Sequence, residues 1–205
     1  MIYLTADTHF NHAGILRYAN RPFETVGQMN QALIDGWNEL VGPNDEVYHL
    51  GDFGFSNSRD RPLDDIFAEL NGRKFLVIGN HDEQNPKVLQ LPWADAWHYR
   101  KLRWDGKKAI LSHYPFETWD GAHRGTVHFH GHCHGGLEST RGGRVDVGVD
   151  AIGSTPAPVD DAFRWATEIA YIPVDHHGRD GQPPNSNAKP SQPSAPSNER
   201  PDHDR

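Results

Sequence analysis

Apolar and polar positions alternate along the first half of the chain in blocks that are typical of an α/β sheet. Three short apolar runs predict strands at residues 2–6, 46–50 and 74–78. Between the first two runs, Thr25 and Gln28 are spaced as in a capping box, which indicates where a helix begins. Apolar residues then recur at helical spacing: Met29, Leu33, Trp37 and Leu40. Pro62 suits the first turn of another helix. Strands that alternate with helices predict a sheet of buried parallel strands.

The second half of the chain has shorter strands joined by tight turns. Residues 97–104 and 107–112 flank Asp105-Gly106, a two-residue signal that is typical of a β-hairpin. Further strands are predicted at 126–130 and 144–149, and a closing helix at 160–170. This pattern indicates an antiparallel portion, which we expect to form a second sheet packed on the first.

The last part of the chain has a different composition. Residues 175–205 are rich in Pro, Gly, Ser and Asn, with only Ala188 and Ala195 as apolar side chains. Such a segment cannot bury enough surface to offset the entropy lost on ordering, so we expect a disordered tail. Residues 1–174 are then expected to form a single domain.

Charge and cysteine content limit the classes of protein that fit. The 28 acidic residues outnumber the 20 basic ones, which gives a net charge of -8. Such a surface repels phosphate backbones, so we expect no strong binding to duplex nucleic acid. No apolar run approaches the ~20 residues that a membrane-spanning helix needs. Residues 1–5 lack a secretory signal, and Cys133 is the only cysteine, so a cytoplasmic location is expected.

Candidate chemistry lies in five polar clusters, each directly after a predicted strand. They are Asp7-Thr8-His9, Gly51-Asp52, Gly79-Asn80-His81-Asp82, His113 and Gly131-His132-Cys133-His134. Binding sites of open α/β sheets form at the carboxyl ends of the strands, so these loops are expected to converge. Their oxygen and nitrogen donors suit divalent Mn, Fe, Zn or Ni. The number of donors suits two ions that share a carboxylate, an arrangement that clamps a phosphoryl group and activates a water. This excess of donors argues against an oxygenase with one metal ion.

These blocks, in this order, resemble the signature of calcineurin-like metallophosphoesterases. The resemblance covers roughly residues 1–155. Within the family, the sequence is similar to the small, uncapped branch found in bacteria and phages. It implies a four-layer α/β/β/α sandwich of two mixed sheets flanked by helices. It also implies two bound divalent metal ions, of which Mn²⁺ is expected to be the most effective in vitro.

The resemblance also implies roles for individual residues. The first metal ion would be held by Asp7, His9 and His134, and the second by Asn80, His113 and His132. Asp52 would bridge the two ions, and a hydroxide between them would attack phosphorus. His81 would hydrogen-bond the phosphate and protonate the leaving oxygen, and Asp82 would orient His81.

Residues near these blocks have two interpretations each. Asn11, His12 and Arg17 are candidates for lining the substrate mouth, although Arg17 and Arg21 are more typical of solvated loop charges. His128 and His130 share a strand face and are expected to point to solvent or to a layer behind the metal ligands. Asp146 and Asp150 either orient a ligand histidine or shape a turn.

The expected activity is hydrolysis of a small, nucleotide-type phosphodiester by a binuclear metal centre. The alternatives are a phosphomonoesterase and a non-catalytic interaction scaffold on the same fold. A nucleotide or a short RNA end remains open as substrate. Five basic residues around the hairpin form either a strip for RNA or a solvated edge: Arg100, Lys101, Arg103, Lys107 and Lys108. A dimer is also left open.

Overall fold

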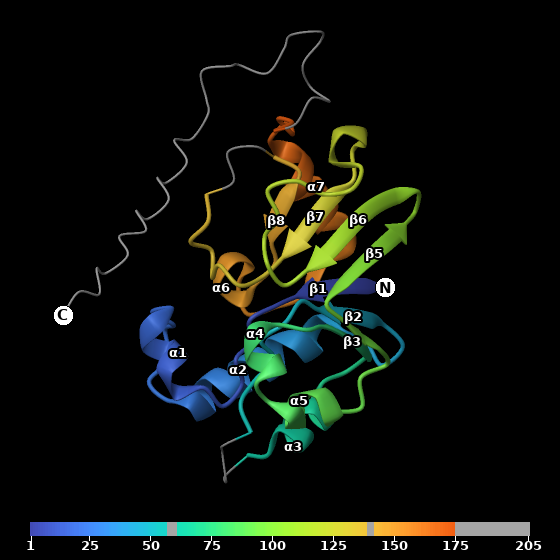
Figure 1. The fold of residues 1–205 in the computed structure, drawn as a ribbon. Helices are drawn as coiled ribbons and strands as arrows, with labels where there is room; N and C mark the ends of the chain where they lie inside the picture. Colours follow the sequence, from blue (N-terminus) through green and yellow to red (C-terminus); the bar gives the residue numbers. More distant parts are fainter. Residues whose placement is uncertain (57–60, 139–141, 175–205) are drawn as a thin grey trace, which may run out of the picture.

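Two β-sheets stack face to face in the computed structural model, which describes residues 1–56, 61–138 and 142–174 (Figure 1). The first sheet has the strand order β4-β3-β2-β1-β9. Its strands are β1 (Ile2–Thr5), β2 (Glu46–His49), β3 (Arg73–Val77), β4 (Ala96–Trp97) and β9 (Ala157–Pro158). The first four pair in parallel, and β9 pairs antiparallel to β1, so the sheet is mixed. The predicted parallel strands are confirmed.

The second sheet has the order β5-β6-β7-β8. Its strands are β5 (Tyr99–Trp104), β6 (Lys107–Ser112), β7 (Val127–His130) and β8 (Arg144–Asp146). The hairpin turn is as predicted: Asp105 and Gly106 both have positive φ, at 45° and 78°. Only the β5–β6 pair is antiparallel, however, because β6, β7 and β8 pair in parallel. Within the second sheet, the antiparallel pairing that the short strands suggested is therefore confined to the hairpin.

The helices are α1 (Ala13–Tyr18), α2 (Val26–Leu40), α3 (Leu63–Glu69), α4 (Asn80–Glu83), α5 (Pro86–Gln90), α6 (Val149–Ile152) and α7 (Val159–Glu168), with a 3₁₀ turn at Ala122–Arg124. The predicted capping box starts α2. The Thr25 hydroxyl accepts the Gln28 N–H at 3.2 Å, and the Gln28 side chain accepts the Thr25 N–H at 3.3 Å. Two of the backbone N–H groups at this helix end are thereby satisfied.

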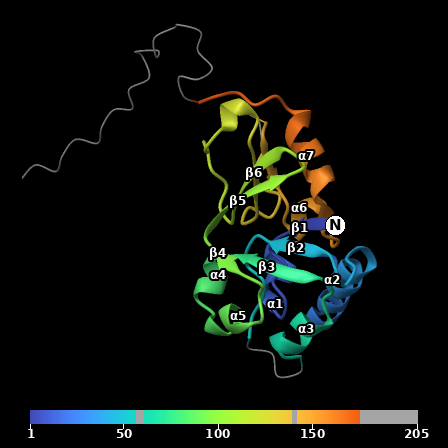
Figure 2. The same cartoon turned by 90° about the vertical axis from the view of Figure 1, so that its right-hand side faces the viewer.

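Both faces of the first sheet are buried, which explains why its strands are continuous apolar runs. In β1, Tyr3 packs on the side of α1, α2, α3 and α5, while Ile2 and Leu4 face the second sheet. Figure 2 shows these helices below the first sheet and α7 beside the second. Helix α7 packs into the core between the sheets through residues such as Ala162 and Phe163. The predicted fold, two mixed sheets flanked by helices, is confirmed.

His128 and His130 are buried, which excludes solvent as one of the two places expected for them. They lie on the face of β7 turned away from the first sheet, which the 113–126 segment covers. The His128 ring stacks on Phe116 with centroids 4.9 Å apart and also contacts Trp119. The two side chains share one face of the strand, as predicted. The residues that bury this face lie outside the strand, so the strand pattern does not predict its burial.

Two further predictions concern the C-terminal tail and membrane-spanning helices. The predicted disordered tail, residues 175–205, lies outside the described residues, so the domain boundary at residue 174 stays a prediction. Among the helices of the described ranges, none is both long and apolar enough to cross a bilayer.

His128 should make the stability of the fold depend on pH. Burial lowers its pKa to about 3, and Nε2 accepts the Phe116 N–H at 3.1 Å, which a protonated ring cannot do. The charges of His130 and Arg144 act in the same direction. Because an unfolded histidine titrates near ~6.5, the folded state binds fewer protons. The stability contributed by neutral His128 is present above that pH and is lost as the pH falls below it.

We therefore expect the free energy of unfolding of the metal-free protein to fall between pH 6.5 and pH 5. In His128→Gln, whose side chain does not titrate, the slope should be shallower by up to about 1.4 kcal/mol per pH unit. Urea unfolding at several pH values measures it. Equal slopes in the two proteins would show that His128 is not the group responsible.

Candidate metal centre

The polar clusters at the carboxyl ends of β1, β2, β3, β6 and β7 meet at one place in the fold. The Asp7 carboxylate after β1 accepts the N–H of His132 after β7 at 2.9 Å. His113 after β6 lies with Nε2 at 3.1 Å from the Asn80 amide oxygen after β3. The expected convergence of these loops is therefore observed.

Asp52 lies at the centre of this cluster. Its Oδ2 is 3.5 Å from Nε2 of His113 and 3.7 Å from Nε2 of His9. The same oxygen is 4.0 Å from Nε2 of His81, while Oδ1 accepts the His81 backbone N–H at 2.9 Å. One buried carboxylate thus faces imidazoles that come from three different loops.

Three overlapping groups of side chains have ligand atoms close enough together to hold a metal ion. They are Asp7 with His9 and His134, Asp7 with Asp52 and His113, and His9 with Asp52 and His81. The first is the set predicted for one ion, and Asp52 joins the other two. His81, which was expected not to bind metal, also lies within reach. His132 and Asn80 adjoin the cluster through His113, whose ring centroid is 5.1 Å from that of His132.

The side chains fit a divalent cation. His9 is buried, and within the described part of the chain neither of its ring nitrogens has a hydrogen-bond partner. Leaving such a group without a partner costs free energy, so an unpartnered buried imidazole indicates a ligand. Burial lowers the pKa of His9 well below its usual value, which keeps the ring neutral and its lone pair available.

Two further histidines have their tautomers fixed so that Nε2 points into the cluster. Nδ1 of His113 lies 2.8 Å from the Leu50 carbonyl oxygen, and Nδ1 of His134 lies 2.6 Å from Asp150 Oδ2. Each Nδ1–H donates to that acceptor, so Nε2 is the nitrogen left to bind a metal ion, once the ring has lost its Nε2 proton. This is the arrangement in which proteins commonly orient histidines that bind metals.

The carboxylates are held in opposite electrostatic states. Burial raises the pKa of Asp7 to about 7, although His113 and His134 oppose the shift. Burial also acts to raise the pKa of Asp52, but the hydrogen bond and charge of His113, together with His9, bring it down to about 2. Asp52 in turn raises the pKa of His113 to about 9 against the effect of burial. The metal-free cluster thus needs positive charge beside Asp52, which a bound cation would supply.

The backbone of the cluster is strained in a way that the sequence did not predict. Six residues from the predicted blocks and their flanks have left-handed φ angles: Asp7 at 56°, His9 at 49°, Asn11 at 63°, Asp52 at 60°, His132 at 71° and His134 at 49°. Each such residue costs roughly 1 kcal/mol or more, and such strain gathers at functional sites. Asp, Asn and His tolerate this region better than most side chains, which is the one local signal the sequence carries.

Glycines next to the predicted ligand residues allow side chains of the cluster to approach the backbone closely. Gly51 has φ of 99°, a conformation that glycine adopts without strain, directly before Asp52. Gly79 and Gly131 have ordinary φ, but a Cβ on Gly131 would lie 2.6 Å from Asp7 Oδ2, and one on Gly79 would overlap the Asp52 carboxylate. Close packing against carboxylates, rather than a turn, therefore explains these two glycines.

Asp82 has partners other than the expected ones. Its buried carboxylate accepts three backbone N–H groups, from Asp52 at 2.8 Å, Phe53 at 2.9 Å and Gly79 at 2.9 Å. The sequence interpretation placed Asp82 against the His81 ring, whereas in the structure it ties the loop after β2 to the start of α4. It therefore fixes the two segments that carry Asp52 and His81.

Arg21 is buried, so its interpretation as a solvated loop charge is wrong. Nε and Nη2 donate to the two oxygens of Asp150, each at 2.8 Å, and further N–H groups bond the carbonyl oxygens of Asp7 at 2.6 Å and Thr8 at 2.8 Å. Asp150 also accepts from His134. Of the two interpretations of Asp150, the contact with a histidine of the cluster is the one observed. Asp146 accepts the N–H groups of Gly135 and Gly148, which is turn chemistry.

The three candidates for the substrate mouth lie in different environments. Asn11 is buried, and its amide bonds the Arg61 carbonyl oxygen at 2.9 Å and the Asn30 side chain at 2.7 Å, so it fastens a loop and is not free for substrate. His12 lines a cavity of about 370 Å³ beside His9 and His81. Arg17 is exposed on α1 against Tyr18.

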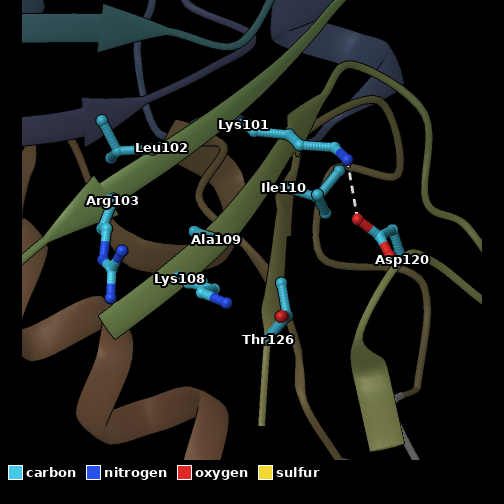
Figure 3. A pocket seen from close by; sticks show the side chains of 8 residues that line it. All are labelled: Lys101, Leu102, Arg103, Lys108, Ala109, Ile110, Asp120 and Thr126. Carbon is cyan, nitrogen blue, oxygen red and sulfur yellow. Dashed lines mark hydrogen bonds and ion pairs between the residues drawn. The ribbon is translucent and has the colours of Figure 1, made fainter. Parts of the chain in front are cut away.

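A second hollow, of about 150 Å³, lies on the hairpin side of the second sheet (Figure 3). Its basic residues include Lys101, Arg103 and Lys108, and Lys101 donates to Asp120 at 2.7 Å. Lys107 likewise pairs with Asp160 at 3.1 Å. Acidic partners thus neutralise part of the hairpin charge, which favours the solvated edge over a strip for RNA.

Comparison with known proteins agrees with this geometry. The family described as calcineurin-like phosphoesterase matches residues 1–183. The uncharacterized protein MJ1445 of Methanocaldococcus jannaschii is 33% identical over 165 residues, which cover 78% of this chain and 87% of that protein. The gene 66 protein of mycobacterium phage D29 is 28% identical over 197 residues, 82% of this chain and 96% of that protein.

Among solved structures, protein AQ665 of Aquifex aeolicus, described as of unknown function, aligns with a TM-score of 0.64 at 24% identity. The alignment covers 80% of this chain and 98% of that one. At this level of identity the likeness concerns the fold.

Replacing Asp150 should destabilise the fold. In Asp150→Asn the buried Arg21 guanidinium loses its counter-ion, which typically costs about 3 kcal/mol or more. Asp160→Asn is the matched control, because Asp160 pairs with Lys107 on the surface and should change stability by less than about 0.5 kcal/mol. Urea unfolding of the metal-free proteins measures both. Similar stabilities for the two variants would contradict the structural role of the Arg21–Asp150 pair.

Proposed function

Because this chain belongs to the calcineurin-like phosphoesterase family, we propose that it hydrolyses a small phosphodiester of the nucleotide type with two divalent cations. Membership makes it a metal-dependent enzyme that acts on phosphoric esters. The number of ions, the class of ester and the ligand roles are the parts proposed here.

The observation that carries the proposal is the position of Asp52 between two sets of donors. Asp7, His9 and His134 form one group of donors, and Asn80 and His132 lie beside His113, which itself groups with Asp52 and Asp7. Asp52 Oδ2 faces His9 from the first set and His113 from the second. A carboxylate that faces nitrogen donors from both predicted ligand sets supports two ions with Asp52 as the bridge.

When bound, such ions neutralise charge on the phosphoryl oxygens and activate water for attack on phosphorus; Mn²⁺ suits this donor set. The chain itself must position the ester and protonate the departing oxygen. His81 is suited to that role because its side chain is 37% exposed, at the rim of the buried cluster. Its backbone N–H is held by Asp52, so the ring has a defined place relative to the ions.

Asp82 is the residue that positions His81. By accepting N–H groups from Asp52 and Gly79, its carboxylate locks the first turn of α4, on which His81 lies, against the loop of Asp52. His81 and the bridging carboxylate thus belong to one hydrogen-bonded unit, which keeps the proton donor in place near the leaving oxygen.

The open space beside the cluster favours a diester. A diester carries a second organic group on phosphorus, and this group needs room next to the metal ligands. The cavity of about 370 Å³ between α1 and His9, His81 and His134 provides that room. The unpartnered nitrogens of His9 argue against a scaffold without bound metal, because such a protein would gain stability by satisfying them.

The proposal predicts metal-dependent hydrolysis of bis-p-nitrophenyl phosphate. With Mn²⁺ the protein should release nitrophenol, a chelator should abolish release, and kcat/KM should exceed that for p-nitrophenyl phosphate at least tenfold. A higher kcat/KM on the monoester would make the protein a phosphomonoesterase instead. Silence on both esters in the metal-loaded protein would favour the scaffold.

His81→Ala should lower kcat at least ~10²-fold, because loss of a general acid typically costs that much. The fold and the bound metal should be unchanged, since His81 is not assigned as a ligand. His98→Ala is the control, because His98 is exposed and pairs with the exposed Glu83 rather than with a side chain of the cluster. An unchanged kcat in His81→Ala would remove His81 from the mechanism, and loss of bound metal would make it a ligand.

A further inference from the structure

The cavity beside the metal centre has two chemically different sides. His9, His81 and His134 form the side that belongs to the cluster. The other side is apolar and is formed by α1 and its end, with Ile15, Tyr18 and Ala19, and by Phe55 and His12. The eight described residues that line the cavity include no acidic side chain, so an anionic substrate is not repelled.

Aromatic faces dominate the wall. The His12 and Phe55 rings lie 4.3 Å apart at an interplanar angle of 34°, and Phe55 is 5.3 Å from the His81 ring. Ile15, which is buried, lies among the apolar residues of the wall. Flat, apolar walls next to a polar end suit a ligand that is itself planar at one end and charged at the other.

Tyr18 extends this wall into solvent. Its side chain is one of the large exposed ones, at 72%, although it belongs to a helix whose other face is buried. The Arg17 guanidinium lies 5.1 Å from the ring centroid, and Nη2 donates to the Tyr18 hydroxyl at 3.4 Å. The ring is therefore held at the mouth of the cavity with part of its surface uncovered.

Gly14 gives this arrangement its space. A Cβ at position 14 would lie 2.9 Å from a Tyr18 ring carbon and 3.0 Å from His12 Nε2. Glycine is a poor residue inside a helix, so its presence in the middle of α1 needs a reason other than helix formation. Room for both rings is such a reason.

We propose that this α1-side cavity, formed by His12, Ile15, Tyr18, Ala19 and Phe55, receives the base of a nucleotide while the phosphate of the same molecule lies at the metal centre. The placement of the phosphate rests on the proposed function. The base stacks on the Tyr18 and Phe55 rings, as bases do on exposed aromatic side chains in other proteins. The inference thus assigns a binding place to the nucleoside group of the nucleotide-type substrate.

The test compares two ligands that differ only in the base. Titration calorimetry of the Mn²⁺-loaded full chain would use the non-hydrolysable phosphonate analogues of adenosine 5′-monophosphate and of ribose 5-phosphate. We expect the adenosine analogue to bind at least tenfold more tightly. Tyr18→Ala should raise its Kd about tenfold and leave the Kd of the ribose analogue within twofold, while Tyr18→Phe should resemble the unaltered protein.

Tyr99→Ala is the matched control, since Tyr99 is an exposed tyrosine of the hairpin and should leave both Kd values unchanged. Gly14→Ala provides a second variant that should fold well, because alanine favours the helix, but its methyl group displaces Tyr18 or His12 and should weaken binding of the adenosine analogue. Equal Kd values for the two analogues, or no effect of Tyr18→Ala, would overturn the assignment of the cavity.

Failure of this inference is distinguishable from failure of the proposed function. If the protein hydrolyses diesters but binds the adenosine and ribose analogues equally tightly, only the assignment of the cavity is wrong. Binding of the adenosine analogue that depends on Tyr18, in a protein that hydrolyses no diester, would support the cavity and contradict the proposed function.

Discussion

The burial of two carboxylates side by side is the constraint on which the rest of the structure depends. Asp7 and Asp52 are almost fully buried, with oxygens close enough to share a ligand, so they need compensating charge in the same place. His113 supplies part of it in the metal-free protein. The left-handed backbone at these residues costs conformational free energy. Glycines pack directly against their carboxylate oxygens. Both features are consistent with a site whose strain is offset when a ligand binds. The family to which the chain belongs uses metal ions, which meet this need directly.

Much of the fold follows from local sequence pattern. Apolar runs buried on both faces, a capping box and an Asp-Gly turn each act over a few residues, so the sequence predicts β1, α2 and the β5–β6 hairpin. The clusters that follow the strands also identify the site, because strands of one sheet present their carboxyl ends at the same edge. The ligand roles within that site came from resemblance to a family, and the structure adds their proximity.

The parts that could not be predicted depend on contacts between distant positions. Arg21 and Asp150 are 129 residues apart. The sequence around Arg21 gives no sign that its guanidinium pairs with a buried carboxylate. Asn11 is close in sequence to the ligand residues Asp7 and His9, which suggested a place at the substrate mouth. Its amide instead donates to the Arg61 carbonyl oxygen. Asp82 was assigned to its neighbour His81, whereas its partners are backbone N–H groups that only the folded loops bring together. His128 is different, because the residues that bury it, such as Phe116 and Trp119, are near in sequence but lie in a segment without a regular apolar pattern.

The most direct test of the account is the number of Mn²⁺ ions bound per chain. Equilibrium dialysis of the full chain should give two ions, and electron paramagnetic resonance should show them magnetically coupled through a shared ligand. Asp52→Asn, which retains the shape of the side chain without its charge, should bind one ion or none and lose the coupled signal. A single, uncoupled ion in the unaltered protein, or two coupled ions in Asp52→Asn, would contradict a binuclear centre bridged by Asp52.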